Sequence, residues 1–215
     1  MAQALTSTNA DARADTGPPD DHGTDTGLPD PDRALLRGGD RRAFQRLVDR
    51  HKQPLFAYLA RQTSNRHLAE DLLQEVFMRA YRAGRRGGFD GRCRVRTWLF
   101  VLARHCLIDH QRATRSRPQT RQWADGDDGR PHTTTSTTPL DQSIQRELAQ
   151  RAGNLLHALP DAQREVIAMK VYAGLTFPEI AEVTAAPTST VKSRMRYGLL
   201  KLHELLMADE PGGLQ

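Results

Sequence analysis

Leu175–Leu206 reads LTFPEIAEVTAAPTSTVKSRMRYGLLKLHELL, and this stretch predicts two helices joined by a tight turn. Thr176 and Glu179 have the spacing of a capping box, in which each side chain accepts a hydrogen bond from the other residue's backbone, so a helix should begin here. Pro187 cannot continue a helix and disfavours helical angles in the residue before it. A second helix should therefore begin at Thr188 or the residue after it.

The second helix of this pair is expected to be amphipathic. Its apolar side should carry residues at helical spacing, namely Val191, Met195, Leu199 and Leu202. Its polar side carries the cationic and hydroxyl side chains Thr190, Lys192, Ser193, Arg194 and Arg196. Two short helices with a cationic second member are typical of a helix-turn-helix DNA reader. The alternative is a helical hairpin of an ordinary bundle with a solvated charged face.

Basic residues are concentrated in one part of the 215-residue chain. Residues 34–117 contain nineteen basic and seven acidic residues, a net charge of +12, whereas residues 148–215 contain seven of each. A strongly basic block suggests a polyanionic partner. Arginine outnumbers lysine by 27 to 4, which suits phosphate binding but is equally explained by a GC-rich genome.

The chain divides into two helical domains with polar segments around them. Residues 1–32 contain almost no large apolar residues and are expected to be disordered, as is the short tail 209–215. Residues 33–117 and 146–208 carry apolar residues at helical spacing and lack the alternation of a strand. The polar segment 118–145 is expected to be a flexible linker, so that the two all-α domains move independently.

Two features of the basic domain are candidates for function. The predicted helix 65–86 carries a polar cluster on its exposed side, formed by Asp71, Gln74 and Glu75. This cluster is either a solvated face or a docking surface for a basic partner. The loop 84–96 then combines several glycines, Phe89 and five arginines. Glycine lets the backbone approach a ligand closely, and arginines around an aromatic ring suit stacked bases and phosphates.

Other classes of protein are disfavoured by the sequence. Cys93 and Cys106 match no common metal-binding spacing, and no nucleotide-binding loop or nucleophile motif is present, so we expect no metal, no cofactor and no enzymatic activity. No apolar run is long enough to span a membrane, and the N-terminus does not have the pattern of a secretory signal. We therefore expect a cytoplasmic protein without membrane insertion.

Four segments, in order, resemble the extracytoplasmic-function group of bacterial sigma-70 family sigma factors. They are AFQRLVDRHKQPLFAYLAR, AEDLLQEVFMRAYR, RVRTWLFVLARHCLIDHQR and LPDAQREVIAMKVYAGLTFPEIAEVTAAPTSTVKSRM. The resemblance implies that residues 33–117 form sigma region 2 and residues 146–208 form sigma region 4. It further implies binding to core RNA polymerase, through the β′ clamp helices and the β flap, and to promoter DNA. An anti-sigma factor that clamps both domains is a further partner of many members.

The resemblance also gives roles to residues by position. Asp71, Gln74 and Glu75 match the helix that docks on the β′ clamp helices. The loop and helix that follow match the part that captures flipped bases of the −10 element and helps to open the duplex, where Phe89, Arg96, His105, Asp109 and Arg112 would border the site. Thr190, Lys192, Ser193, Arg194 and Arg196 would read the −35 element in the major groove.

The sequence departs from the family pattern at three places. His105 stands where an asparagine is common, which leaves the preferred −10 base open. Ala185 and Ala186 stand in a turn that often contains glycine. Tyr197-Gly198-Leu199 replaces an Arg-Ala-Arg run, which predicts weaker phosphate contacts at that end. The competing interpretation is a free-standing helix-turn-helix regulator of the LuxR type, which would lack the two helices of residues 65–112.

Overall fold

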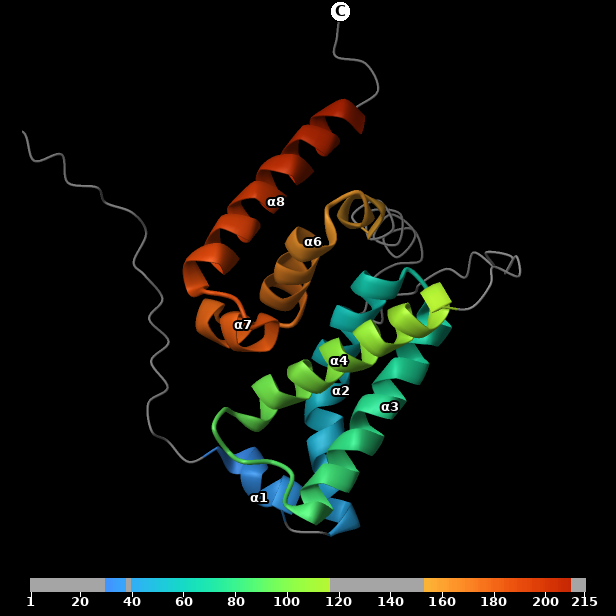
Figure 1. Cartoon of the computed structure of the whole chain (residues 1–215), viewed down its shortest axis with the longest axis vertical. Coiled ribbons are helices and arrows are strands. Elements are labelled where there is room, and N and C mark those ends of the chain that lie inside the picture. The colour runs from blue at the N-terminus through green and yellow to red at the C-terminus, as the bar shows by residue number, and fades with distance from the viewer. Residues whose placement is uncertain (1–29, 38–39, 117–152, 210–215) are drawn as a thin grey trace, which may run out of the picture.

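The computed structural model describes residues 30–37, 40–116 and 153–209, and every regular element in these ranges is a helix (Figure 1). Residues 1–29 of the expected N-terminal tail, the expected linker 118–145 and residues 210–215 of the expected C-terminal tail lie outside the described part. Of the remaining residues assigned to the tails, Asp30 precedes α1 (Pro31–Arg37), Pro31 and Asp32 are its first two residues, and Asp209 is the last residue of the C-terminal helix.

In the N-terminal domain, three long helices follow α1 along the chain. They are α2 (Arg41–Thr63), α3 (Arg66–Arg86) and α4 (Val95–Ser116). Asp40 begins α2 by accepting a hydrogen bond from the Arg42 N–H at 3.0 Å, and Asn65 begins α3 by accepting one from the Leu68 N–H at 3.0 Å. Side chains with an oxygen acceptor are favoured at these positions because the first N–H groups of a helix lack partners within it.

The C-terminal domain is built from short helices and one long one. Residues 153–157 are helical, and α6 (Asp161–Ile167) continues into the π-helix η1 (Ala168–Tyr172). The predicted helix pair follows as α7 (Phe177–Thr184) and α8 (Thr188–Asp209). The structure confirms the capping box, because the Thr176 N–H donates to Glu179 Oε2 at 2.7 Å and the Glu179 N–H donates to Thr176 Oγ1 at 3.4 Å.

The turn between α7 and α8 places an alanine in the left-handed region. Ala185 has a φ of 52°, and its exposed side chain gains little packing in return. Left-handed angles bring a Cβ too close to the following carbonyl, which is why glycine is usual there. This chain therefore keeps the geometry of the turn at a cost in backbone strain.

One predicted core position of α8 is wrong. Leu199 is 47% exposed, whereas Gly198 is buried on the inner face of the helix. A Cβ placed on Gly198 would lie 2.7 Å from Ile167 Cδ1 and 3.3 Å from Gln163 Cβ. α8 thus packs on α6 through a glycine, and the helix is rotated so that Leu199 faces outward.

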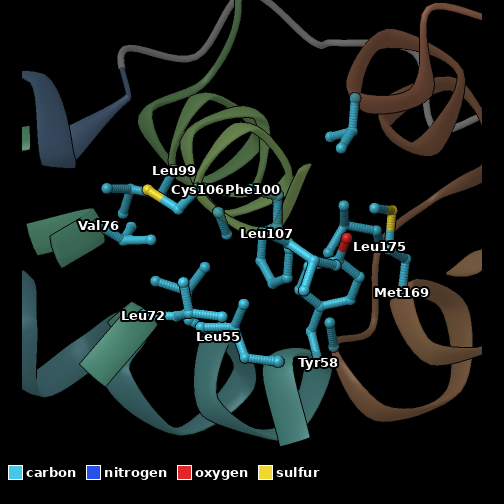
Figure 2. Close-up of a cluster of buried hydrophobic side chains, with 14 of the residues drawn as sticks. Leu55, Tyr58, Leu72, Val76, Leu99, Phe100, Cys106, Leu107, Met169 and Leu175 are labelled. Carbon is cyan, nitrogen blue, oxygen red and sulfur yellow. The ribbon is translucent and has the colours of Figure 1, made fainter. Parts of the chain in front are cut away.

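The two domains share one hydrophobic core, which differs from the independent movement that we expected. Met169 and Leu175 of the C-terminal domain point toward Tyr58, beside Phe100 of the N-terminal domain (Figure 2). All four side chains are at most 1% exposed. The sequence pattern did not reveal this contact, because the same apolar residues could equally have faced the core of their own domain.

Candidate nucleic-acid interface

The candidate −35 residues lie in the first turns of α8. Lys192, Ser193 and Arg196 are exposed, whereas Thr190 and Arg194 are half-buried. The Ser193 hydroxyl donates to the Thr190 carbonyl at 3.0 Å, and the Arg196 guanidinium lies 5.8 Å from the centre of the Tyr197 ring. Val191 is fully buried on the opposite side, so the helix turns its cationic side outward. A major groove admits a helix in this orientation.

The candidate docking residues form a stripe on α3. Asp71 and Gln74 are exposed and Glu75 is half-buried. The stripe continues one turn later with Met78, which is 42% exposed. Positions three, four and seven apart share one face of a helix, so these side chains present an acidic surface with an apolar end.

An arginine connects this stripe to the next helix. Arg79 Nε donates to Glu75 Oε1 at 2.8 Å, and Arg79 Nη1 donates to Asp109 Oδ2 of α4 at 3.0 Å. These bonds, with Glu75 first and Asp109 second, raise the pKa of Arg79 above its usual value. Asp109, a candidate −10 residue, is therefore held against α3 by the same side chain that bonds a candidate docking residue.

The candidate −10 residues fall into three groups. His105, Asp109 and Arg112 are exposed on one stripe of α4. Arg96 lies nine positions before His105, which at about 100° per residue places it on the other side of the helix. The structure therefore brings three of the five residues together on one surface and separates Arg96 from them.

Phe89, expected at the border of the −10 site, is instead buried. Its side chain is 3% exposed and its ring lies 5.1 Å from the Trp98 ring, centre to centre. A ring in this position cannot stack on an incoming base. The physical reason is that the loop folds back over α4, so its one large apolar side chain fills the core beneath it.

Arg96 contacts the C-terminal domain. Arg96 Nη2 donates to the carbonyl oxygen of Ala173, between η1 and α7, and Thr97 Oγ1 donates to Glu179 Oε1 at 3.5 Å. A candidate −10 side chain is thus engaged by the domain that carries the candidate −35 residues.

A second polar contact between the domains is more deeply placed. Glu165 Oε1 of α6 accepts from Arg104 Nε at 2.9 Å and from the Tyr58 hydroxyl at 3.2 Å. The Glu165 side chain is 14% exposed. Burial and then the neighbouring Glu165 charge raise the pKa of Tyr58 well above its usual value, so its hydroxyl stays a donor. The carboxylate therefore has two donors from α2 and α4.

The sequence analysis missed two residues that contact the candidate loop. Asp30 and Arg33 bond to the Val95 N–H and to the Gly91 carbonyl oxygen, respectively. We placed Asp30 in the tail because its neighbours are polar. The signal was nevertheless present, since an aspartate followed by Pro31 is typical of a helix start.

The described residues contain neither a candidate metal site nor a candidate membrane span. Within residues 30–37, 40–116 and 153–209, no group of three or more His, Cys, Asp or Glu side chains is arranged to hold a metal ion. In the same ranges, no helix combines the length and the apolar character that crossing a membrane requires.

Comparison with protein families gives two matches that follow the domain division. Residues 47–117 match the family model for sigma-70 region 2, and residues 155–204 match the model for sigma-70 region 4. The first match runs from Leu47 in α2 through α3 and α4, and the second runs from residue 155 through α6 and α7 to Glu204, near the end of α8.

The similarity to individual relatives extends over most of their length. The chain is 30% identical to the ECF RNA polymerase sigma factor SigW of Bacillus subtilis over 175 residues, which are 80% of this chain and 92% of the relative. It is 31% identical to the ECF RNA polymerase sigma factor SigC of Mycobacterium tuberculosis over 180 residues, which are 82% of this chain and 88% of the relative.

Solved structures support the same assignment. CnrH, in complex with the cytosolic domain of CnrY, matches with a TM-score of 0.61 and 27% identity over 83% of this chain and 99% of CnrH. The sigma factor RpoE of Bartonella quintana, in complex with the anti-sigma factor NepR, matches with a TM-score of 0.59 over 79% of this chain and 99% of RpoE. At 22% identity, the second match shows the fold alone.

Proposed function

Because this chain belongs to the extracytoplasmic-function group of the sigma-70 family of RNA polymerase sigma factors, we propose a role for each of its exposed polar surfaces. The protein binds core RNA polymerase and directs promoter-specific initiation of transcription. A free-standing regulator of the LuxR type is not favoured, since the region 2 match has no place in it. The finer assignments below are our proposals.

The −35 element is read by α8. Lys192, Ser193 and Arg196 face outward from the first turns, where a recognition helix meets base edges. Arg194 is half-buried and reaches the groove from the edge of the same surface. Arginine and lysine that bond to guanine provide specificity, whereas contacts to phosphate fix the position of the helix.

Core polymerase docks on the α3 stripe formed by Asp71, Gln74, Glu75 and Met78. The observation that supports this role is the combination of an exposed carboxylate at Asp71 with the exposed apolar side chain of Met78. Charge complementarity with a basic partner and burial of Met78 would both contribute to binding. The β′ clamp helices are the expected partner, and the β flap is the expected partner of the C-terminal domain.

The −10 element is captured beside α4. His105, Asp109 and Arg112 offer donors and acceptors to an unstacked base and to the backbone. Arg96 lies on the other side of α4 and bonds to Ala173 in this structure, so it contacts DNA apart from these three residues and only after the C-terminal domain has moved. Phe89 supports the loop from below and does not contact DNA.

Three further assignments complete the proposal. The protein performs no chemistry of its own, since sigma factors in general act by binding. It works in the cytoplasm, where core polymerase and promoters are found. An anti-sigma factor binds it, as NepR binds the similar sigma factor RpoE of Bartonella quintana.

Pull-down with core polymerase tests the docking surface. Asp71→Arg combined with Glu75→Arg should abolish retention of the chain on immobilised core enzyme, because two carboxylates that face a basic partner become cations. Asp49→Arg combined with Glu204→Arg changes charge equally at exposed positions on α2 and α8 and should leave retention unchanged. Equal retention of both double variants would remove the α3 stripe as the docking site.

A further inference from the structure

One carboxylate joins the N-termini of α1 and α4. Asp30 Oδ1 accepts a hydrogen bond from the Asp32 N–H at 3.1 Å, and Asp30 Oδ2 accepts one from the Val95 N–H at 2.7 Å. The first N–H groups of a helix lack partners within it, and the helix dipole favours an anion there. Asp30 therefore fixes where α4 begins, across 65 positions of sequence.

Arg33 holds the middle of the loop between α3 and α4. Its guanidinium donates to the Gly91 carbonyl oxygen and lies 6.0 Å from the centre of the Phe89 ring. Gly91 has a φ of +78°, so the loop bends into the left-handed region here. Arg33 thus bonds to the loop at this bend and covers its buried aromatic side chain.

α1 is itself fixed on α2 and α3 without help from the loop. Asp32 is 6% exposed, accepts a hydrogen bond from Arg50, and lies 2.7 Å from His51 Nε2. A Cβ placed on Gly84 would lie 2.7 Å from the Leu36 carbonyl oxygen, so α1 approaches α3 this closely only because Gly84 has no side chain. Asp30 and Arg33 therefore act from a fixed support.

We propose that Asp30 and Arg33 are positioning residues for capture of the −10 strand. They hold loop 87–94 and the first turn of α4, so that the exposed residues His105, Asp109 and Arg112 of α4 meet the strand in one geometry. Both residues lie before residue 47, where the match to sigma-70 region 2 begins. The inference rests on the proposed role of this loop and helix in binding the −10 element.

Promoter opening by the complete holoenzyme tests this role. A promoter is selected by wild-type holoenzyme from random duplexes, and a fluorescent base analogue in its non-template −10 strand reports unstacking. Asp30→Ala should slow opening about tenfold, the factor to which about 1.4 kcal/mol corresponds. The rate of opening by Asp30→Asn should lie between those of the wild type and Asp30→Ala. An amide offers one acceptor oxygen, whereas the two N–H groups now bond to two carboxylate oxygens.

Matched variants separate position from charge. Arg33→Ala should slow opening, whereas Arg41→Ala and Asp49→Ala, which remove the same charges from exposed positions of α2, should not. Gly84→Ala should also slow opening although it changes no charge, because its Cβ displaces α1 from α3.

A local probe distinguishes loop position from loss of fold. In a Trp123→Phe background, Trp98 emission reports the Phe89 contact and should shift to longer wavelength in Asp30→Ala, while core affinity and thermal melting stay at wild-type values. Opening at the wild-type rate in both Asp30→Ala and Gly84→Ala would overturn the positioning role. So would equal loss of core binding and opening, which would make α1 a general support of the fold. A wild-type holoenzyme that opens no promoter would instead contradict the proposed function itself.

Discussion

Ala185→Gly should stabilise the protein, because it relieves the left-handed strain in the turn of the helix-turn-helix. Ala185 has a φ of 52° and an exposed side chain, so removal of its Cβ relieves the backbone without opening a cavity. Left-handed angles cost a residue with a Cβ about 1–2 kcal/mol. Glycine offsets about 0.5–1 kcal/mol of this gain, because a chain with glycine has more conformational freedom when it is unfolded. The free energy of unfolding should therefore rise by about 0.5–1 kcal/mol.

Urea unfolding followed by circular dichroism measures this gain, and thermal melting should rise by about 1–4 °C for a chain of this size. Ala186→Gly is the matched control. Ala186 does not have a positive φ and packs against the core, so glycine there should destabilise. A loss of stability in Ala185→Gly, or a gain of the same size in Ala186→Gly, would refute the assignment of strain to this turn.

Three further predictions concern Glu165 and His157 at the contact between the domains, where His157 Nε2 lies 2.9 Å from Ser64 Oγ, and Arg194 on the −35 surface. Glu165→Ala leaves Arg104 and the buried Tyr58 hydroxyl without their shared acceptor, at a cost of about 1–3 kcal/mol, so fluorescence energy transfer between labels on the two domains should fall; an unchanged signal would contradict the contact. Burial, and then the charges of Arg164 and Arg61, lower the pKa of His157 below 6.5. The unfolded chain therefore binds more protons than the folded one, and the free energy of unfolding should fall as the pH drops below about 6.5. His157→Gln should reduce the change of the urea midpoint between pH 7.5 and 5.5, and an unaltered change would count against this. Arg194→Ala should reduce transcription from a −35-dependent promoter about 5–150-fold, because a base contact contributes about 1–3 kcal/mol of discrimination. Transcription from a promoter that does not use the −35 element should be unchanged.

We propose that the −10 and −35 elements are not read together in the arrangement seen here. By their numbering they lie about 25 base pairs apart, which is about 85 Å at about 3.4 Å per base pair. Arg96 of one domain nevertheless bonds to Ala173 of the other. On this proposal, the domains separate before both surfaces engage one promoter.

Local features of this fold were predictable from the sequence, and the long-range contacts were not. The capping box at Thr176, the caps at Asp40 and Asn65, and the cationic first turns of α8 follow from residues a few positions apart, and the structure has them all. Leu199 was assigned to the core because helical spacing alone cannot reveal that Gly198 allows a closer approach of α6.

The candidate −10 site shows the same division. The sequence predicted a loop over residues 84–96, of which the structure has 87–94 outside the helices, and Phe89 was expected on its surface because exposure of one aromatic ring cannot be read from composition. The support from Asp30 and Arg33 depends on contacts between positions about sixty apart, which no local pattern encodes. Only the pair Asp30-Pro31 gave a sequence signal that we could have used.

Run-off transcription with purified core RNA polymerase tests the central claim most directly. Core enzyme alone, core enzyme with this chain, and core enzyme with the Asp71→Arg, Glu75→Arg variant are each given a library of random duplexes followed by a common transcribed segment. The account predicts transcripts only with the wild-type chain, from templates that share two sequence elements at a fixed spacing. Transcripts that are independent of the chain, or templates with no shared element, would contradict it.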